Sequence, residues 1–159
     1  MAKRRLLFIC TGNYYRSRFA EALFNHFAQR TRIPWGAFSR GLYPEWVEDG
    51  NDLSPHTRIA MLARGIQMKH TGLRRTPLSE VDLKAADHVI ALKRSEHRPM
   101  MLERFPAYAD KIAYWEVHDI DYASPEQALP EIESHVITLT QYLMEDPEGN
   151  FLLTSHSKV

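Results

Sequence analysis

The chain has 159 residues, of which 44% are hydrophobic and 25% are charged, a balance typical of one soluble globular domain. Its 20 basic and 20 acidic residues cancel, so neither nucleic acid nor a membrane surface is an expected partner. Cys10 is the only cysteine, which excludes an intramolecular disulfide, and no spacing suggests zinc, so no metal or other cofactor is expected. Without any run near the ~18 apolar residues of a membrane span, the protein is expected in a reducing cytoplasm.

The predicted elements alternate between strands and helices along the chain. The first strand covers 5–9, and apolar residues at helical spacing predict a helix from Ser17 to about Arg30. Later strands are predicted over 35–39, 87–92 and 112–117, and later helices from Ser54, after Leu78, over 96–105 and from Pro125 to about Met144. In the helix from Ser54, the apolar face is assigned to Ile59, Met61, Leu62 and Ile66.

This order of elements predicts an α/β fold. The sheet is expected to be parallel, with about four strands, and doubly wound, with helices on both faces. A single domain is expected over 1–145, and the polar residues 146–159 are expected to form a C-terminal tail. In such a sheet, ligands bind beyond the carboxyl ends of the strands, close to helix N-termini.

The turn between the first strand and the first helix, CTGNYYRS, has the composition of an anion site. Gly12 lets the backbone approach a ligand closely, and successive N–H groups at a helix N-terminus cradle an anion. Arg16 adds a planar fork of donors that suits phosphate oxygens. Cys10, in this positive potential, is expected to ionise readily and act as a nucleophile. For an isolated C-x5-R, a small buried cysteine beside a surface arginine is the alternative interpretation.

The same stretch resembles the phosphate-binding loop of the low-molecular-weight protein tyrosine phosphatases, C-x-G-N-x-C-R-S. Five residues match, namely Cys10, Gly12, Asn13, Arg16 and Ser17, whereas Tyr15 stands where the family has a second cysteine. Further similarity is found in Ser39-Arg40-Gly41, in GIQMKH over 65–70 and in AADHVIAL over 85–92. The resemblance covers about 6–143.

The resemblance implies a phosphomonoesterase, and specifically a protein tyrosine phosphatase. In that family the cysteine, here Cys10, attacks phosphorus and forms a thiophosphate that water then hydrolyses. The expected substrate is a phosphorylated protein or a small aryl phosphate, and inorganic phosphate or sulfate is expected to bind in the same loop. The resemblance implies that the phosphate-binding residues are Thr11, Gly12, Asn13, Tyr14, Tyr15, Arg16 and Ser17. Ser17 is expected to donate a hydrogen bond to the thiolate, and a supporting network is expected from Asn13, Ser17, Ser39 and His70.

Expulsion of the leaving group requires a general acid. The family places an aspartate after its fourth strand, usually as Asp-Pro, and this position corresponds to Asp119. Ile120 replaces the proline, and Asp121-Tyr122 offers a competing register, so Asp121 is the alternative acid. A solvated loop carboxylate without a catalytic role is the structural alternative for both.

The substrate wall is assigned to Tyr14, Tyr15 and Trp46, whose rings could stack on a phenyl group. Tyr14 occupies the position where a small threonine favours phosphoarginine in some relatives, so its bulk argues against that substrate. Two other functions remain open. One is an arsenate reductase that uses an external thiol, because the chain lacks relay cysteines, and the other is a non-catalytic phosphate-binding module.

Overall fold

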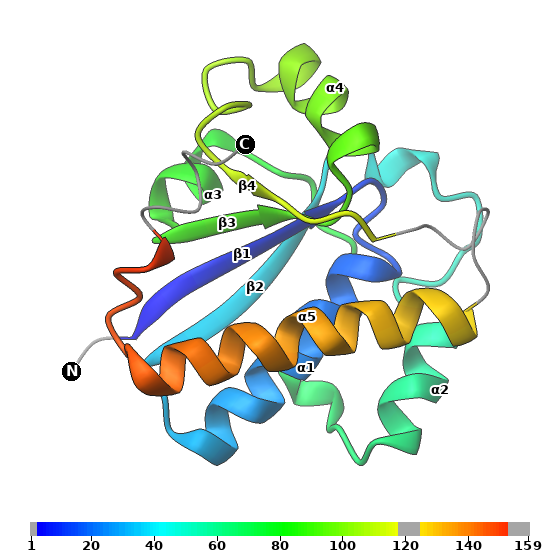
Figure 1. Cartoon of the computed structure of the whole chain (residues 1–159). Helices are drawn as coiled ribbons and strands as arrows, with labels where there is room; N and C mark the ends of the chain where they lie inside the picture. The colour runs from blue at the N-terminus through cyan, green and yellow to red at the C-terminus, as the bar shows by residue number, and fades with distance from the viewer. Residues whose placement is uncertain (1–2, 118–124, 153–159) are drawn as a thin grey trace.

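The computed structural model describes residues 3–117 and 125–152 and contains a four-stranded parallel sheet with the order β2-β1-β3-β4 (Figure 1). The strands are β1 (Arg4–Cys10), β2 (Trp35–Gly41), β3 (His88–Ala91) and β4 (Ala113–Tyr114). The helices are α1 (Arg16–Thr31), α2 (Pro55–Ala63), α3 (Glu80–Ala85), α4 (Arg94–Arg104) and α5 (Pro125–Glu145), with short 3-10 turns η1 (Pro44–Trp46) and η2 (Met68–His70). The predicted α/β fold is confirmed.

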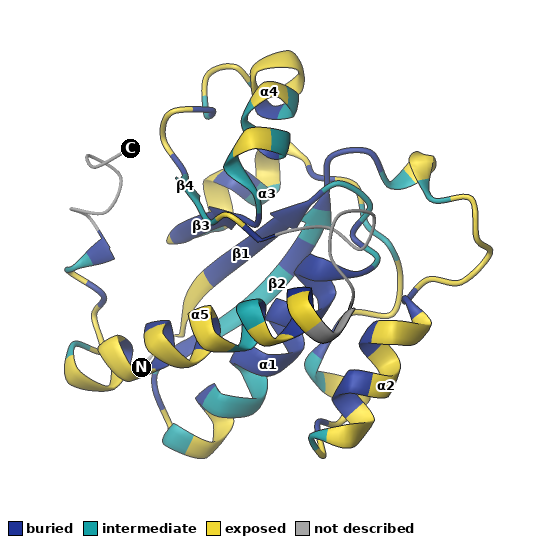
Figure 2. Ribbon diagram, turned by 45° about the vertical axis from the view of Figure 1, so that its right-hand side comes forward, coloured by how far each residue is buried: buried dark blue, intermediate teal, exposed yellow. Residues whose placement is uncertain are grey.

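Helices cover both faces of the sheet, with α1 and α5 on one side and α3 and α4 on the other. Central strand β1 explains this sandwich, because its side chains alternate between two cores. Leu6 and Phe8 pack toward α1 and α5, while Leu7 and Ile9 pack in the cluster that includes α3 and α4. A strand segment buried on both faces is apolar, and β1 is buried from Leu6 to Cys10, whereas Arg4 and Arg5 at its start are exposed (Figure 2).

The edge strand β4 is shorter than the predicted strand over 112–117. Beyond it the chain still follows the end of β3, since the N–H of Trp115 donates to the Ala91 carbonyl and the N–H of Val117 to the Leu92 carbonyl, each at 2.8 Å. The pairing is irregular because Lys93 and Glu116 form an isolated antiparallel bridge. This path brings Val117 to the carboxyl edge of the sheet.

The predicted apolar face of α2 is partly wrong. Ile59 and Leu62 are 65% and 69% exposed, whereas Met61 is buried. The buried positions are Thr57, Ala60 and Met61, which are spaced as one helical face. Thr57 takes an inward position because its hydroxyl donates to the Tyr15 carbonyl at 3.1 Å, so the helix turns a polar side chain toward the loop and leaves two large apolar ones in solvent.

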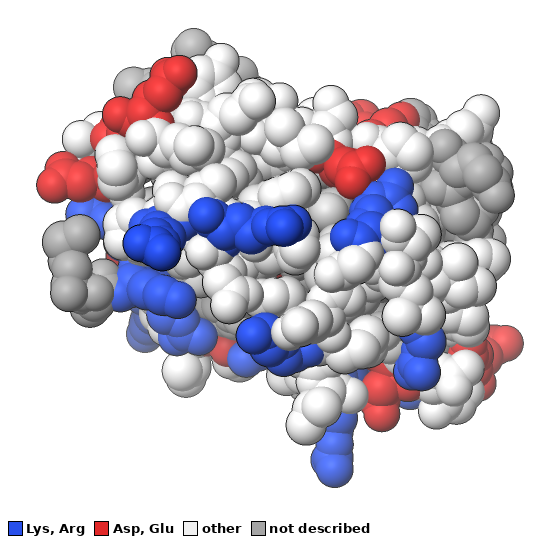
Figure 3. Space-filling model, turned by 90° about the horizontal axis from the view of Figure 1, so that it is seen from below, with Lys and Arg blue, Asp and Glu red and all other residues white. Residues whose placement is uncertain are grey.

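The surface charge is unevenly distributed although the chain is neutral overall. Lys and Arg side chains form a broken band across the face seen from below, and Asp and Glu lie mainly toward its margins (Figure 3). Within residues 3–117 and 125–152, no helix has the length and apolar character needed to cross a membrane.

Close approach of β2 to the turn after β1 explains the glycine at position 41. A Cβ there would lie 2.8 Å from the backbone nitrogen of Asn13 and 2.9 Å from the carbonyl carbon of Gly12. These are backbone atoms, so a side chain would displace the turn itself. Gly36, on the same strand, has the Lys3 side chain at 4.0 Å as its nearest neighbour.

Gly41→Ala is therefore expected to destabilise the protein by ~1–3 kcal/mol, the usual cost of overpacking, and to weaken binding of inorganic phosphate. Gly36→Ala is the matched control and is expected to stay within about 0.5 kcal/mol of the wild type. Urea unfolding and titration calorimetry with phosphate measure the two effects. Equal behaviour of the two variants would show that the close approach does not constrain the turn.

Candidate active site

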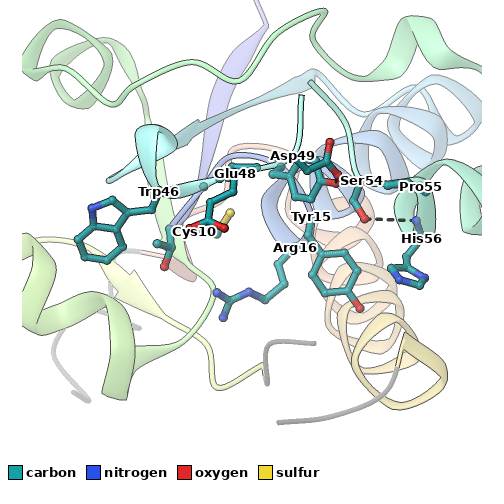
Figure 4. A pocket seen from close by; sticks show the side chains of 13 residues that line it. Cys10, Tyr15, Arg16, Trp46, Glu48, Asp49, Ser54, Pro55 and His56 are labelled. Atoms are coloured by element: carbon teal, nitrogen blue, oxygen red, sulfur yellow. Dashed lines mark hydrogen bonds between the residues drawn. The ribbon is translucent and has the colours of Figure 1, made fainter. Parts of the chain in front are cut away.

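The turn after β1 forms the floor of a cavity of about 620 Å³ at the carboxyl edge of the sheet. Its walls come from this turn, from residues 46–49 in the connection between β2 and α2, and from residues 54–56 at the start of α2. Figure 4 shows Cys10 and Arg16 between Trp46 on one side and Tyr15 and His56 on the other. Sequence segments that are distant from each other thus surround the single thiol.

Cys10 ends β1 and is buried, and its sulfur lies 2.9 Å from the hydroxyl oxygen of Ser17. That oxygen also accepts a hydrogen bond of 3.0 Å from the side-chain amide of Asn13. The Ser17 oxygen has two lone pairs and one hydrogen, so it can meet both the Asn13 amide and the sulfur. Cys10 and Asn13 thus share one hydroxyl partner in the first turn of α1.

Asn13 adopts a left-handed backbone conformation, with φ of 51°, and its side chain is buried. Asparagine is among the few residues other than glycine that adopt this conformation readily. Its amide nitrogen donates to the hydroxyl oxygens of Ser17 and Ser39, the latter at 2.9 Å, and its oxygen accepts from the N–H of Thr76 at 2.9 Å. The side chain is therefore locked by partners from α1, β2 and the segment before α3.

Arg18 and Glu21 form a buried ion pair beneath this turn, with 3.9 Å between Nε and Oε1, and sequence reasoning missed it. The hydroxyls of Ser39 and Thr71 donate to the carboxylate of Glu21 at 2.7 and 2.9 Å, and Nε of Arg18 donates to the Thr71 oxygen at 2.7 Å. Arg18 also donates to the Asn13 carbonyl at 3.3 Å. Burial raises the pKa of Glu21, while the two hydroxyls and the charge of Arg18 act against that increase. The sequence does contain one indication of this pair, because Arg18 and Glu21 are three positions apart on the buried face of the predicted helix.

His70 lies elsewhere than predicted. Its ring packs near the ring of His26, with 6.0 Å between centroids, and its carbonyl accepts from the Asn25 amide at 3.0 Å. The neighbouring residue Thr71 reaches the supporting network instead, through Glu21. The physical reason is that η2 ends at His70, where the bond from Asn25 holds the backbone carbonyl while the ring lines a shallow surface cavity.

Arg16 begins α1, is only 2% exposed and forms an ion pair that the sequence did not indicate. Its Nη2 lies 2.6 Å from Oε2 of Glu96, on α4, and the Thr11 hydroxyl donates to the same oxygen at 2.6 Å. Nε2 of His97 is 2.9 Å from it. Burial alone would raise the pKa of Glu96, but the hydrogen bond from His97 and the charge of Arg16 hold that pKa well below its usual range.

The three residues predicted as the substrate wall have different environments. The Tyr14 hydroxyl donates to the carboxylate of Asp49, and burial together with this bond raises the pKa of Tyr14 to about 12. Tyr15 lines the cavity but is largely buried in the core. Trp46 is 58% exposed at the cavity and stacks on Tyr43, with 4.0 Å between ring centroids. Of these three side chains, Trp46 is exposed, Tyr14 is intermediate and Tyr15 is buried.

Asp119 and Asp121, the two predicted acids, lie outside the described residues. Val117, the last described residue before them, contacts the cavity floor, because its carbonyl accepts from Nη1 of Arg16 at 3.4 Å. Among residues 3–117 and 125–152, no group of three or more His, Cys, Asp or Glu side chains is placed to hold a metal ion.

Comparison with known proteins agrees with this geometry. Residues 5–148 match the model of the low molecular weight phosphotyrosine protein phosphatase family. A protein-arginine-phosphatase of Bacillus subtilis (strain 168) is 31% identical over 107 residues, which is 67% of each chain. A low molecular weight protein tyrosine phosphatase from T. tengcongensis has a similar structure, with a TM-score of 0.70 and 30% identity, over 91% of this chain and 99% of that one.

A mutant of the YwlE arginine phosphatase, with serine in place of cysteine and with a phosphorylated active-site serine, is also similar. Its TM-score is 0.71 at 26% identity, over 89% of this chain and 97% of that one. The fold, the strand-turn-helix geometry around Cys10 and the extent of the family match agree. The chain belongs to the low-molecular-weight protein tyrosine phosphatase family and is a hydrolase of that family.

Proposed function

We propose that this phosphatase uses Cys10 as its nucleophile and acts on phosphotyrosine in proteins or on similar aryl phosphates. The observation that carries the proposal is the position of the Cys10 sulfur, buried at the floor of the cavity, with Ser17 at 2.9 Å and Arg16 on the same floor. A thiolate at a helix N-terminus beside an arginine is suited to attack a phosphoryl group that the same groups hold.

The reaction proceeds in two steps. The Cys10 sulfur forms a bond to phosphorus as the bond from phosphorus to the ester oxygen breaks, and an aspartic acid, Asp119, gives its proton to that oxygen. Water then attacks phosphorus, the sulfur–phosphorus bond breaks, and the thiolate, inorganic phosphate and a proton are released. The phosphorylated serine in the mutant YwlE arginine phosphatase supports a covalent intermediate at the corresponding position.

Arg16 and the backbone N–H groups of residues 11–17 bind the phosphoryl oxygens in both steps, since positioning and charge stabilisation supply most of the catalysis in phosphoryl transfer. Ser17 stabilises the sulfur as the leaving thiolate of the second step, because its hydroxyl lies against it. Asn13 and Ser39 hold the turn in the conformation that this binding requires.

The aromatic walls favour a phenyl ring, because Trp46 presents an exposed face and Tyr14 adds a second ring at the cavity. Phosphoarginine is the second candidate substrate. It is favoured by the relative named protein-arginine-phosphatase and by Glu48 and Asp49 on the cavity wall, whose carboxylates complement a guanidinium group. Tyr14 opposes it, because the ring and its bond to Asp49 occupy part of that wall.

Steady-state hydrolysis of matched phosphotyrosine and phosphoarginine peptides separates the two substrates. The wild type is expected to have at least ~10-fold higher kcat/KM for phosphotyrosine, the scale on which a pocket of the wrong shape discriminates. Tyr14→Thr is expected to shift the ratio toward phosphoarginine. Cys10→Ser is expected to abolish hydrolysis of both peptides. The proposed enzyme is contradicted if Cys10→Ser still hydrolyses either peptide, or if the wild type hydrolyses neither. The latter result would favour a phosphate-binding module.

The acid is tested with esters of different leaving groups. Asp119→Ala is expected to lower kcat by ~10²–10⁴ for a poor leaving group, the usual contribution of a general acid. An activated aryl ester should lose far less, because its leaving group needs little protonation. Asp121→Ala is the matched variant, and a larger selective loss from it would assign the acid to Asp121.

The support of the turn is tested at Asn13. Asn13→Gly keeps the left-handed backbone available but removes three hydrogen bonds, whereas Asn13→Ala also introduces backbone strain. Both variants are expected to bind inorganic phosphate more weakly, and Asn13→Ala is expected to be less stable by a further ~1–2 kcal/mol. Urea unfolding and phosphate calorimetry measure this. Wild-type phosphate binding by Asn13→Gly would remove the side-chain network from the proposal.

A further inference from the structure

Glu96 contacts Arg16 from outside the cavity. Arg16 is one of the described residues that line the cavity, and Glu96 is not among them. The carboxylate is nevertheless 2.6 Å from Nη2 of Arg16, and the carbonyl of Val117 accepts from Nη1 at 3.4 Å. Two acceptors therefore contact the two terminal nitrogens of the guanidinium, and together they restrict the rotation of its plane.

Glu96 is itself fixed by its neighbours. Oε2 accepts from the Thr11 hydroxyl at 2.6 Å and lies 2.9 Å from Nε2 of His97. Nδ1 of the fully buried His97 accepts from the N–H of Lys93 at 3.0 Å, so in the neutral ring the hydrogen is on Nε2, where it faces the carboxylate. One oxygen at the first turn of α4 thus joins that helix to the residue after the nucleophile and to Arg16.

We infer that Glu96 is a positioning residue, which fixes the guanidinium of Arg16 in the orientation required at the transition state of phosphoryl transfer. The inference rests on the proposed roles of Cys10 and Arg16. A guanidinium oriented before the substrate arrives pays no ordering cost during the reaction, and displacement by ~1 Å in such a site costs about 100-fold in rate. If the salt bridge served stability alone, its removal would leave kcat and KM of the folded protein unchanged.

Removal of the carboxylate charge is expected to lower kcat without raising KM. Glu96→Gln is expected to lower kcat between about tenfold and 100-fold, because Arg16 is no longer held. KM for a phosphate ester and the dissociation constant of inorganic phosphate are expected to stay constant or fall, since a negative charge near the bound anion is lost. The loss in kcat should be equal for good and poor leaving groups, unlike the loss from removing a general acid.

The experiment compares Glu96→Gln and Glu96→Asp in the full chain, with Glu103→Gln, an exposed position on the same helix, as the matched control. Glu96→Asp keeps the charge but shortens the reach, and it should also lower kcat by at least about tenfold. Thermal unfolding of each variant shows whether it is folded. If Glu96→Gln does not fold, Glu96→Asp decides alone, and a wild-type kcat in that variant overturns the inference.

A double-mutant cycle with Arg16→Lys shows whether Glu96 acts through Arg16. In the Arg16→Lys background, Glu96→Gln is expected to change kcat by less than about twofold, because the group that it positions is gone. Equal losses in both backgrounds, or a wild-type kcat in Glu96→Gln, would overturn the inference. Failure of the proposed function is distinguishable, because it appears as a wild type without Cys10-dependent turnover.

Discussion

The left-handed backbone of Asn13 turns the chain between β1 and α1, and the geometry around Cys10 depends on it. This conformation persists because the side chain of Asn13 is hydrogen-bonded to Ser17, Ser39 and Thr76, which belong to three different parts of the fold. The same constraint explains Gly41, since any side chain at that position would collide with the turn. The left-handed conformation of one residue is therefore held by partners that are distant in the sequence.

Two ion pairs flank this turn, one buried below it and one partly buried beside it. Arg18 and Glu21 lie underneath, and Arg16 pairs with Glu96 at the side. Buried arginines without a counterion would be costly, and each carboxylate offsets that cost before any phosphate binds. In the proposed function, these carboxylates would balance the cationic groups of the anion site and hold their orientation before the ligand arrives.

In the proposed function, different parts of the cavity would bind the phosphoryl group and recognise the group that carries it. The floor comes from one continuous segment, residues 10–16, whereas the walls come from 46–49 and 54–56. The Tyr14–Asp49 bond joins the two parts, because Tyr14 belongs to the floor segment and Asp49 to the wall. In the proposed function, substitutions in the wall could change substrate preference without disturbing the core, because Trp46, Glu48 and Asp49 are exposed.

The sequence by itself determined the elements and the floor of the site, because both depend on short-range properties. Alternating strands and helices follow from hydrophobic periodicity, and Cys10 and Arg16 lie within one strand-turn-helix unit that the resemblance identified. Tertiary structure alone decided the partners. Glu96 is 80 residues from Arg16, and Thr71 rather than His70 joins the network under the turn. Periodicity places a residue on one face of an element, but which distant side chain meets it depends on how complete elements pack, and no local pattern specifies that choice.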